Sequence, residues 1–240
     1  MLAPEATADT LLGVDLPKSD MRTLAIGDIH GCNTALVSLL NKVQPTSEDR
    51  VVFLGDYIDR GPSSRQVVET LLELNKSCST IFIRGNHEKM MLDARGSFLA
   101  SNPSQSYCGL DALCSYGTNS DQDWVSRIPA THWEFFERTA RFFETDTHIF
   151  VHACLDSELE VHDQPDWFLY WERFDRLQPH KTGKRIICGH TSQPTGRIKD
   201  IGFAVCIDTG PETGGWLTCL EAGSGHYWQA SERGDVRTGL

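Results

Sequence analysis

The chain has 240 residues, of which 40% are apolar and 23% are charged, and its formal net charge is −11. This length suits one domain with a full hydrophobic core. The acidic balance argues against nucleic-acid binding, which needs a basic surface, and no apolar run approaches the roughly 20 residues that span a bilayer. The N-terminus lacks the regions of a signal peptide, and the eight cysteines form no Cys-x-x-Cys pair. We therefore expect free thiols and a cytoplasmic location.

Short apolar runs recur along the chain and predict buried strands. Residues 1–20 are expected to form a flexible N-terminal arm or an edge segment, and residues 21–240 are expected to form a single domain. The expected strands are Thr23–Ile26, Val51–Leu54, Thr80–Ile83, His148–Val151, Arg185–Cys188 and Phe203–Ile207. Amphipathic helical patterns lie between several of them, so the sequence predicts an α/β fold with helices packed on a sheet.

Three segments carry the apolar spacing of an amphipathic helix. They are residues 33–43, residues 63–76, which begin at a serine N-cap after Pro62, and residues 132–143. Residues 89–130 carry weaker strand signals and several polar breaks. We expect this stretch to be an insertion of helices and loops near the functional site.

Side chains that can bind a metal follow five of the predicted strands. They are Asp28, His30, Asp56, Asn86, His152 and His190. Loops at the carboxyl ends of strands converge in sheet proteins, so these side chains are expected to meet. One histidine at a strand end is usually structural, but a repeated pattern at five strand ends is hard to assign to chance.

Oxygen and nitrogen ligands without cysteine suit Mn, Fe or Zn rather than Ca. Six side chains are too many for one catalytic metal that keeps an open position, and they suit two metals that share one carboxylate. Asp56 lies in the middle of the three N-terminal loops and is the candidate bridge. We expect two divalent ions as cofactors, with Mn²⁺ favoured.

Several motifs resemble those of the phosphoprotein phosphatase family of calcineurin-like metallophosphoesterases. They are GDIHG at 27–31, GDYIDRG at 55–61, GNHE at 85–88, His152 and Gly189-His190. The motifs cover about residues 23 to 210, and the ending from Ile207 resembles the bacterial branch of the family. The resemblance implies a four-layer fold with a central β-sandwich flanked by helices, which makes residues 21–240 a catalytic domain.

The resemblance also implies a role for each matching residue. Asp28, His30 and Asp56 would hold the first metal, and Asp56, Asn86, His152 and His190 the second. His87 would be the general acid, oriented by Asp59. The phosphate of the substrate would contact Arg60, Arg84 and Arg173.

The implied activity is hydrolysis of phosphoserine or phosphothreonine in proteins, with possible action on phosphotyrosine, by a hydroxide that bridges two metals. The partner is then a phosphorylated protein or peptide. A rival is a symmetrical dinucleoside-tetraphosphate hydrolase, whose first motif is typically Gly-Asp-Leu-Gln-Gly, whereas His30 occupies the fourth place here. A noncatalytic metal-binding module would lack a ligand or His87, and every expected group is present.

Overall fold

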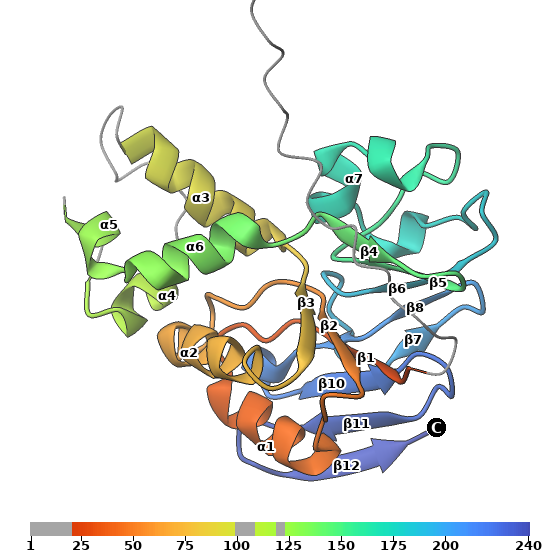
Figure 1. The fold of residues 1–240 in the computed structure, drawn as a ribbon, viewed down its shortest axis with the longest axis horizontal. Coiled ribbons are helices and arrows are strands. Elements are labelled where there is room, and N and C mark those ends of the chain that lie inside the picture. The colour runs from red at the N-terminus through yellow and green to blue at the C-terminus, as the bar shows by residue number, and fades with distance from the viewer. Residues whose placement is uncertain (1–20, 99–108, 119–122) are drawn as a thin grey trace, which may run out of the picture.

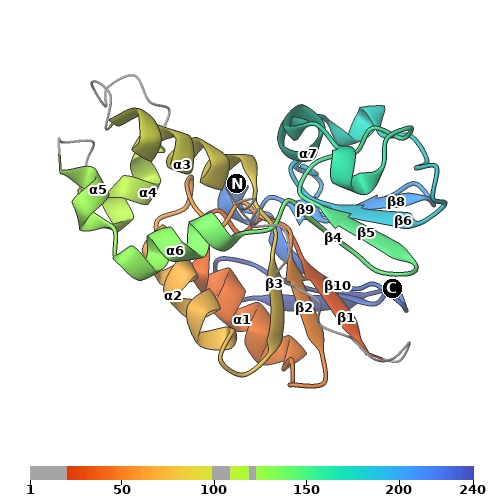
Figure 2. The ribbon, with the colours of Figure 1, turned by 45° about the horizontal axis from the view of Figure 1, so that its top comes forward.

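The computed structural model describes residues 21–98, 109–118 and 123–240 (Figure 1). The predicted N-terminal arm, residues 1–20, lies outside the described residues, as do parts of the predicted insertion at 89–130. The described residues form two β-sheets with helices on their outer faces (Figure 2).

The first sheet has seven strands and contains three of the predicted ones. Its order is β12 (Val236–Gly239), β11 (Tyr227–Ala230), β10 (Trp216–Glu221), β1 (Thr23–Ile26), β2 (Arg50–Phe53) and β3 (Ser79–Phe82), with β9 (Asp208–Thr209) paired to β10. Strands β1, β2 and β3 run parallel, and β10 joins β1 antiparallel. The carboxyl ends of the three parallel strands therefore lie at one edge.

The second sheet has five strands. Its order is β4 (Phe142–Glu144), β5 (His148–Val151), β6 (Arg185–Cys188), β8 (Ala204–Cys206) and β7 (Lys199–Asp200). Strands β5, β6 and β8 run parallel, and the two outer strands run antiparallel to their neighbours. The predicted strands of both halves of the chain are thus confirmed, and their ends agree to within two residues. They belong to two separate sheets.

Helices cover the outer face of each sheet. On the first sheet lie α1 (Asn33–Val43) and α2 (Ser64–Leu74), and on the second lies α7 (Asp166–Trp171). Beside α2 lie α4 (Leu110–Ser115) and α6 (Ala130–Arg138), and α3 (Asn86–Phe98) packs on α6. The short helix α5 (Trp124–Arg127) precedes α6, and 3₁₀ turns occupy Val161–Asp163, Phe174–Arg176 and Pro211–Thr213. This arrangement confirms the expected sandwich flanked by helices.

The apolar run at β2 reflects burial of the first sheet on both faces. Successive side chains of a strand point to opposite faces. Val51 and Phe53 pack in the core beneath the helices, whereas Val52 and Leu54 pack in the core between the two sheets. A strand that is buried on both faces reads as a continuous apolar run, not as an alternation.

Two details differ from the predicted elements. The helix expected over residues 132–143 ends at Arg138, because Thr139 is extended and Ala140 pairs with Ile83 before β4 begins. Ser63 precedes α2 but makes no side-chain capping bond, and the neighbouring Ser64 hydroxyl instead accepts the Asp59 N–H at 3.0 Å. Ser64 therefore stabilises the loop before the helix.

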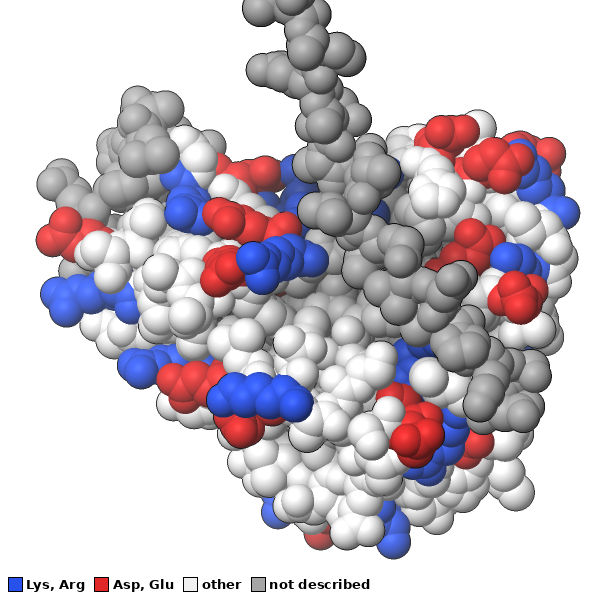
Figure 3. Space-filling model, viewed as in Figure 1, with Lys and Arg blue, Asp and Glu red and all other residues white. Residues whose placement is uncertain are grey.

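The described surface carries charges of both signs. Figure 3 shows lysines and arginines interspersed with acidic residues on the face in view. In the parts of the chain that the structure describes, no helix is long and apolar enough to cross a membrane, and the seven cysteines are free.

Removing a ring from the core between the sheets should destabilise the protein strongly. Phe150 is completely buried there, so Phe150→Ala is expected to lower the free energy of unfolding by about 3–5 kcal/mol. Chemical denaturation measures this change. Trp167, which is 62% exposed, is the matched aromatic control, and Trp167→Ala should cost within about 0.5 kcal/mol. Equal losses for both variants would contradict the described packing.

Candidate metal centre

The predicted ligands follow the carboxyl ends of strands from both sheets. The first sheet supplies Asp28 and His30 after β1, Asp56 after β2 and Asn86 at the start of α3 beyond β3. The second sheet supplies His152 after β5 and His190 after β6. All are buried except His190, which is partly exposed. The sandwich thus brings both halves of the predicted set to one end.

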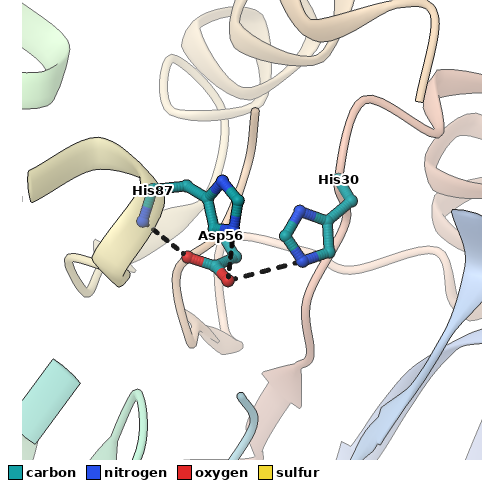
Figure 4. A group of neighbouring side chains, drawn as sticks. All are labelled: His30, Asp56 and His87. Carbon is teal, nitrogen blue, oxygen red and sulfur yellow. Dashed lines mark hydrogen bonds and ion pairs between the residues drawn. The ribbon is translucent and has the colours of Figure 1, made fainter. Parts of the chain in front are cut away.

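The Asp56 carboxylate joins two groups of side chains that can hold a metal. In the first group, shown in Figure 4, Asp56 Oδ2 lies 3.4 Å from His30 Nε2 and 3.9 Å from His87 Nε2. In the second group, Asp56 Oδ1 lies 3.5 Å from His152 Nε2, and His190 completes the set. The ligand atoms of each group lie within 4.8 Å of one another. Each oxygen of Asp56 therefore faces a different group.

Asn86 belongs to the second group. Its Oδ1 lies 2.9 Å from His152 Nε2 and 3.1 Å from His190 Nδ1. Asp56, Asn86, His152 and His190 thus converge as the sequence predicts for the second metal, and their role as its ligands is our proposal.

The hydrogen bonds of two histidines fit a bound cation. His30 and His152 use Nδ1 to donate to the carbonyls of Ile58 and Leu54, at 3.0 and 2.9 Å. In a neutral imidazole the other nitrogen is then an acceptor. Both Nε2 atoms point toward the Asp56 carboxylate, which also only accepts. Acceptors that face each other in a buried site need a cation between them, so these residues fit the metal that the donor set implies.

The pKa shifts keep the histidines ready to bind metal. Burial lowers the pKa of His30 and of His152. Burial and the neighbouring His152 together lower the pKa of His190 to about 4. Burial opposes ionisation of Asp56, but the four surrounding histidines outweigh it and hold its pKa below the usual range. Neutral imidazoles around a carboxylate are the protonation states that metal binding requires.

Asp28 lies outside both groups. Both of its oxygens accept the backbone N–H of His190, at 3.2 and 3.0 Å. Burial, Asp208 and Asp56 raise its pKa well above the usual range. Gly189 allows this approach, because a Cβ there would lie 1.9 Å from Asp28 Oδ1. The ligand role of Asp28 stays a prediction.

His87 is held by a carboxylate instead. Its Nδ1 lies 2.6 Å from Asp59 Oδ2. Burial opposes protonation of His87, but Asp56 and Asp59 outweigh it and raise its pKa to about 9. A protonated imidazole offers two donors and no lone pair. These features suit a proton donor better than a metal ligand.

Glu88 is a residue of this site that sequence reasoning missed, although it closes the GNHE motif. It is completely buried. One oxygen accepts the N–H groups of Asp56 and Gly85, at 2.9 and 3.0 Å, and the other accepts that of Tyr57 at 2.8 Å. Burial, with the Asp56 charge, raises its pKa to about 7. Glu88 therefore ties the loop after β2 to the loop after β3.

The backbone is strained where the site is built. Among the described non-glycine residues, those with a left-handed backbone are His30, Gln44, Asp56, Asp59, Arg60 and His190. All but Gln44 belong to the predicted site. Such conformations cost on the order of 1–3 kcal/mol each and persist only where the surroundings impose them. The loops are therefore held in shape for the site.

The three predicted phosphate-binding arginines differ in their surroundings. Arg60 is about half exposed and bonds through Nη1 to Glu212 at 3.0 Å. Arg84 donates through Nε to Thr139 Oγ1 and through Nη2 to carbonyls at the end of α6. Arg173 is exposed, 3.9 Å from Asp175. Phosphate binding by all three stays a prediction.

Glu212 is a second residue that the sequence analysis missed. Its side chain is 3% exposed, and its Oε2 is buried without a hydrogen-bond partner. It lies in the 3₁₀ turn Pro211–Thr213. The buried Glu212 carboxylate therefore holds the half-exposed guanidinium of Arg60 in place.

Residues 21–199 match the model of the family described as calcineurin-like phosphoesterase. The chain belongs to this family. Its resemblance to calcineurin-like metallophosphoesterases is thereby confirmed, and the members of this family are phosphoesterases. The family is dimetal-dependent, and the two groups around Asp56 can bind metal.

The relatives of this phosphoesterase described here are named either as a protein phosphatase or as bis(5'-nucleosyl)-tetraphosphatases. Serine/threonine-protein phosphatase 1 of Salmonella typhimurium is 32% identical over 80% of this chain and 88% of its own. The asymmetrical bis(5'-nucleosyl)-tetraphosphatase PrpE of Anoxybacillus flavithermus is 25% identical over 81% and 88%. The symmetrical bis(5'-nucleosyl)-tetraphosphatase of Janthinobacterium is 26% identical over 66% and 58%.

A solved structure has the same fold as this phosphoesterase. A cold-active protein tyrosine phosphatase matches with a TM-score of 0.62 at 18% identity, over 91% of this chain and 78% of its own. At this identity the likeness establishes the fold alone.

Changing the shared carboxylate should affect both metal groups. Asp56→Asn is expected to lose most of both ions, because each Asp56 oxygen faces one group. His190→Ala should lose about one of two ions. Elemental analysis after dialysis against Mn²⁺ measures the content, with the exposed His162→Ala as control. One ion retained at full occupancy in Asp56→Asn would disprove the bridge.

Proposed function

We propose that this phosphoesterase removes phosphate from phosphoserine and phosphothreonine in proteins, using two divalent ions, with Mn²⁺ favoured. The observation that carries the proposal is His87, which is buried beside the metal groups and bonded through Nδ1 to Asp59 Oδ2 at 2.6 Å. The similarity to the Salmonella serine/threonine-protein phosphatase supports it, as does His30 in the first motif.

The chemistry of a phosphomonoester explains what the site must supply. The dianion repels anionic nucleophiles, and its uncatalysed hydrolysis is among the slowest known. Two bound divalent cations neutralise phosphate charge and lower the pKa of water. Arg60 offers a planar guanidinium to the remaining phosphate oxygens, and it stabilises the charge that builds up during in-line displacement.

His87 acts on the leaving group. A serine alkoxide is too basic to depart without a proton. Asp59 orients the imidazole through Nδ1, so Nε2–H is the donor left for the departing oxygen. A noncatalytic module would have no use for such a proton donor.

A dinucleoside-tetraphosphate hydrolase is the second candidate. Two of the relatives described above carry that name, at 25% and 26% identity. Cleavage of a polyphosphate releases a phosphate anion, which needs far less protonation than an alkoxide. A histidine that Asp59 holds in place as a proton donor therefore favours the monoester.

A direct comparison of substrates tests the proposal. The Mn²⁺-loaded protein is assayed on phosphoserine, phosphothreonine and phosphotyrosine peptides beside diadenosine tetraphosphate. We expect the highest kcat/KM on the first two peptides. A higher value on diadenosine tetraphosphate would reject the protein-phosphatase proposal and establish the second candidate.

Loss of the proton donor should depend on the leaving group. General acid catalysis contributes about 10²–10⁴-fold. His87→Asn should lose most of this factor on a phosphoserine peptide and much less on para-nitrophenyl phosphate, whose leaving group is stable near neutral pH. Metal content should stay near wild type. Equal losses on both substrates, with chemistry rate-limiting, would assign His87 a positioning role instead.

Glu212 should act on phosphate only through Arg60. Glu212→Ala frees the guanidinium, so we expect inhibition by inorganic phosphate to weaken about three- to tenfold. Glu212→Gln keeps an acceptor and should weaken it less. In an Arg60→Ala background the Glu212→Ala change should add nothing. An equal effect in both backgrounds would show that Glu212 acts independently of Arg60.

A further inference from the structure

A cavity lies at the end of the sandwich opposite the metal centre. Its volume is about 760 Å³, and its walls include Thr23, Arg50 and His148, the first residues of β1, β2 and β5. The same strands deliver metal-site residues at their other ends, roughly 15–20 Å away at the rise of a strand. None of the residues lining this cavity belongs to the predicted site.

Arg50 is a buried cation without a counter-ion. Only 9% of the residue is exposed, and its Nε is buried without a hydrogen-bond partner. Within the described ranges, its side chain forms no ion pair. Its guanidinium lies 5.2 Å from the centre of the Phe143 ring, another wall of the cavity. A buried charge without a partner is costly, and a ring face offsets part of that cost.

The other charges at the cavity are of two kinds. Arg22 is bonded to Asp49 and Glu144 to Lys184, at 2.6 and 2.9 Å, so these charges are compensated. Asp146 and Glu221, which also line the cavity, form no ion pair within the described part of the chain. Two carboxylates outside any close ion pair disfavour a multiply charged anion. A single negative charge that reaches Arg50 is the better match.

We propose that this cavity binds a small monocarboxylate with an apolar or aromatic body. Its carboxylate would accept the N–H groups of Arg50, a geometry that guanidinium and carboxylate share. Its body would lie against Phe143, which lines the cavity and is partly exposed. The volume lies within the range of small-molecule sites in proteins.

Benzoate and benzamide are matched probes, because they share a ring and differ in charge. Calorimetry on the Mn²⁺-loaded protein should detect one benzoate site and at least tenfold weaker binding of benzamide. Arg50→Met should weaken benzoate binding about tenfold or more, with kcat on the monoester unchanged. Arg50→Lys, which keeps the charge but not the fork of donors, should weaken it severalfold.

Controls separate this site from the metal centre and from general surface charge. Arg60→Ala should leave benzoate affinity unchanged, and so should Arg197→Met, which removes an exposed arginine. Benzoate binding that is lost in Arg60→Ala, that is equal in Arg50→Met and wild type, or that is no tighter than benzamide binding would overturn the proposal. Inorganic phosphate, if it binds in competition with benzoate and more tightly, would also overturn the carboxylate assignment.

Discussion

The buried carboxylate of Asp56 is the constraint around which the site is arranged. It is 2% exposed, and among the described residues the backbone N–H that bonds to its carboxylate is that of His87, at 3.1 Å. His30 and His152 direct Nε2 toward it, at 3.4 and 3.5 Å, and His87 Nε2 lies 3.9 Å away. Burying an ionised carboxylate in this way is unfavourable unless positive charge approaches it. The arrangement therefore favours the binding of cations beside Asp56.

The architecture follows from that requirement. The first sheet holds Asp56 in a left-handed conformation that Glu88 fixes through backbone N–H groups. The second sheet contributes His152 and His190, which no loop of the first sheet provides. Packing the sheets face to face places both sets at one end, and the apolar core between them sets their separation. The packing of the two sheets therefore assembles the site that is proposed to bind the metals.

Much of the fold could be predicted because its signals are local. Short apolar runs marked both sets of parallel strands, and glycine-flanked polar residues marked the loops that follow them. The end of α6 could not be predicted, because Ala140 and Phe143 continue the helical spacing of apolar residues. In the structure Ala140 instead pairs with Ile83, the residue that follows β3. Strands β10, β11 and β12 lack intervening helices, so the alternation that marks the six predicted strands does not mark them, and the short strands β4, β7 and β9 were not predicted either.

The site could be predicted only in part, for a related physical reason. Ligand types and strand ends are visible in sequence, and Asp56, Asn86, His152 and His190 converge as expected. The partners of arginines and carboxylates are not visible, because they come from distant segments. The Arg60–Glu212 bond spans 152 positions.

An X-ray structure of the Mn²⁺-loaded protein, with anomalous scattering used to locate the ions, tests the role of Asp56 most directly. The account predicts two peaks about 3.5–4 Å apart, each bound to a different oxygen of Asp56, with His87 bound to neither. A single peak, or two peaks of which one does not contact Asp56, would contradict it.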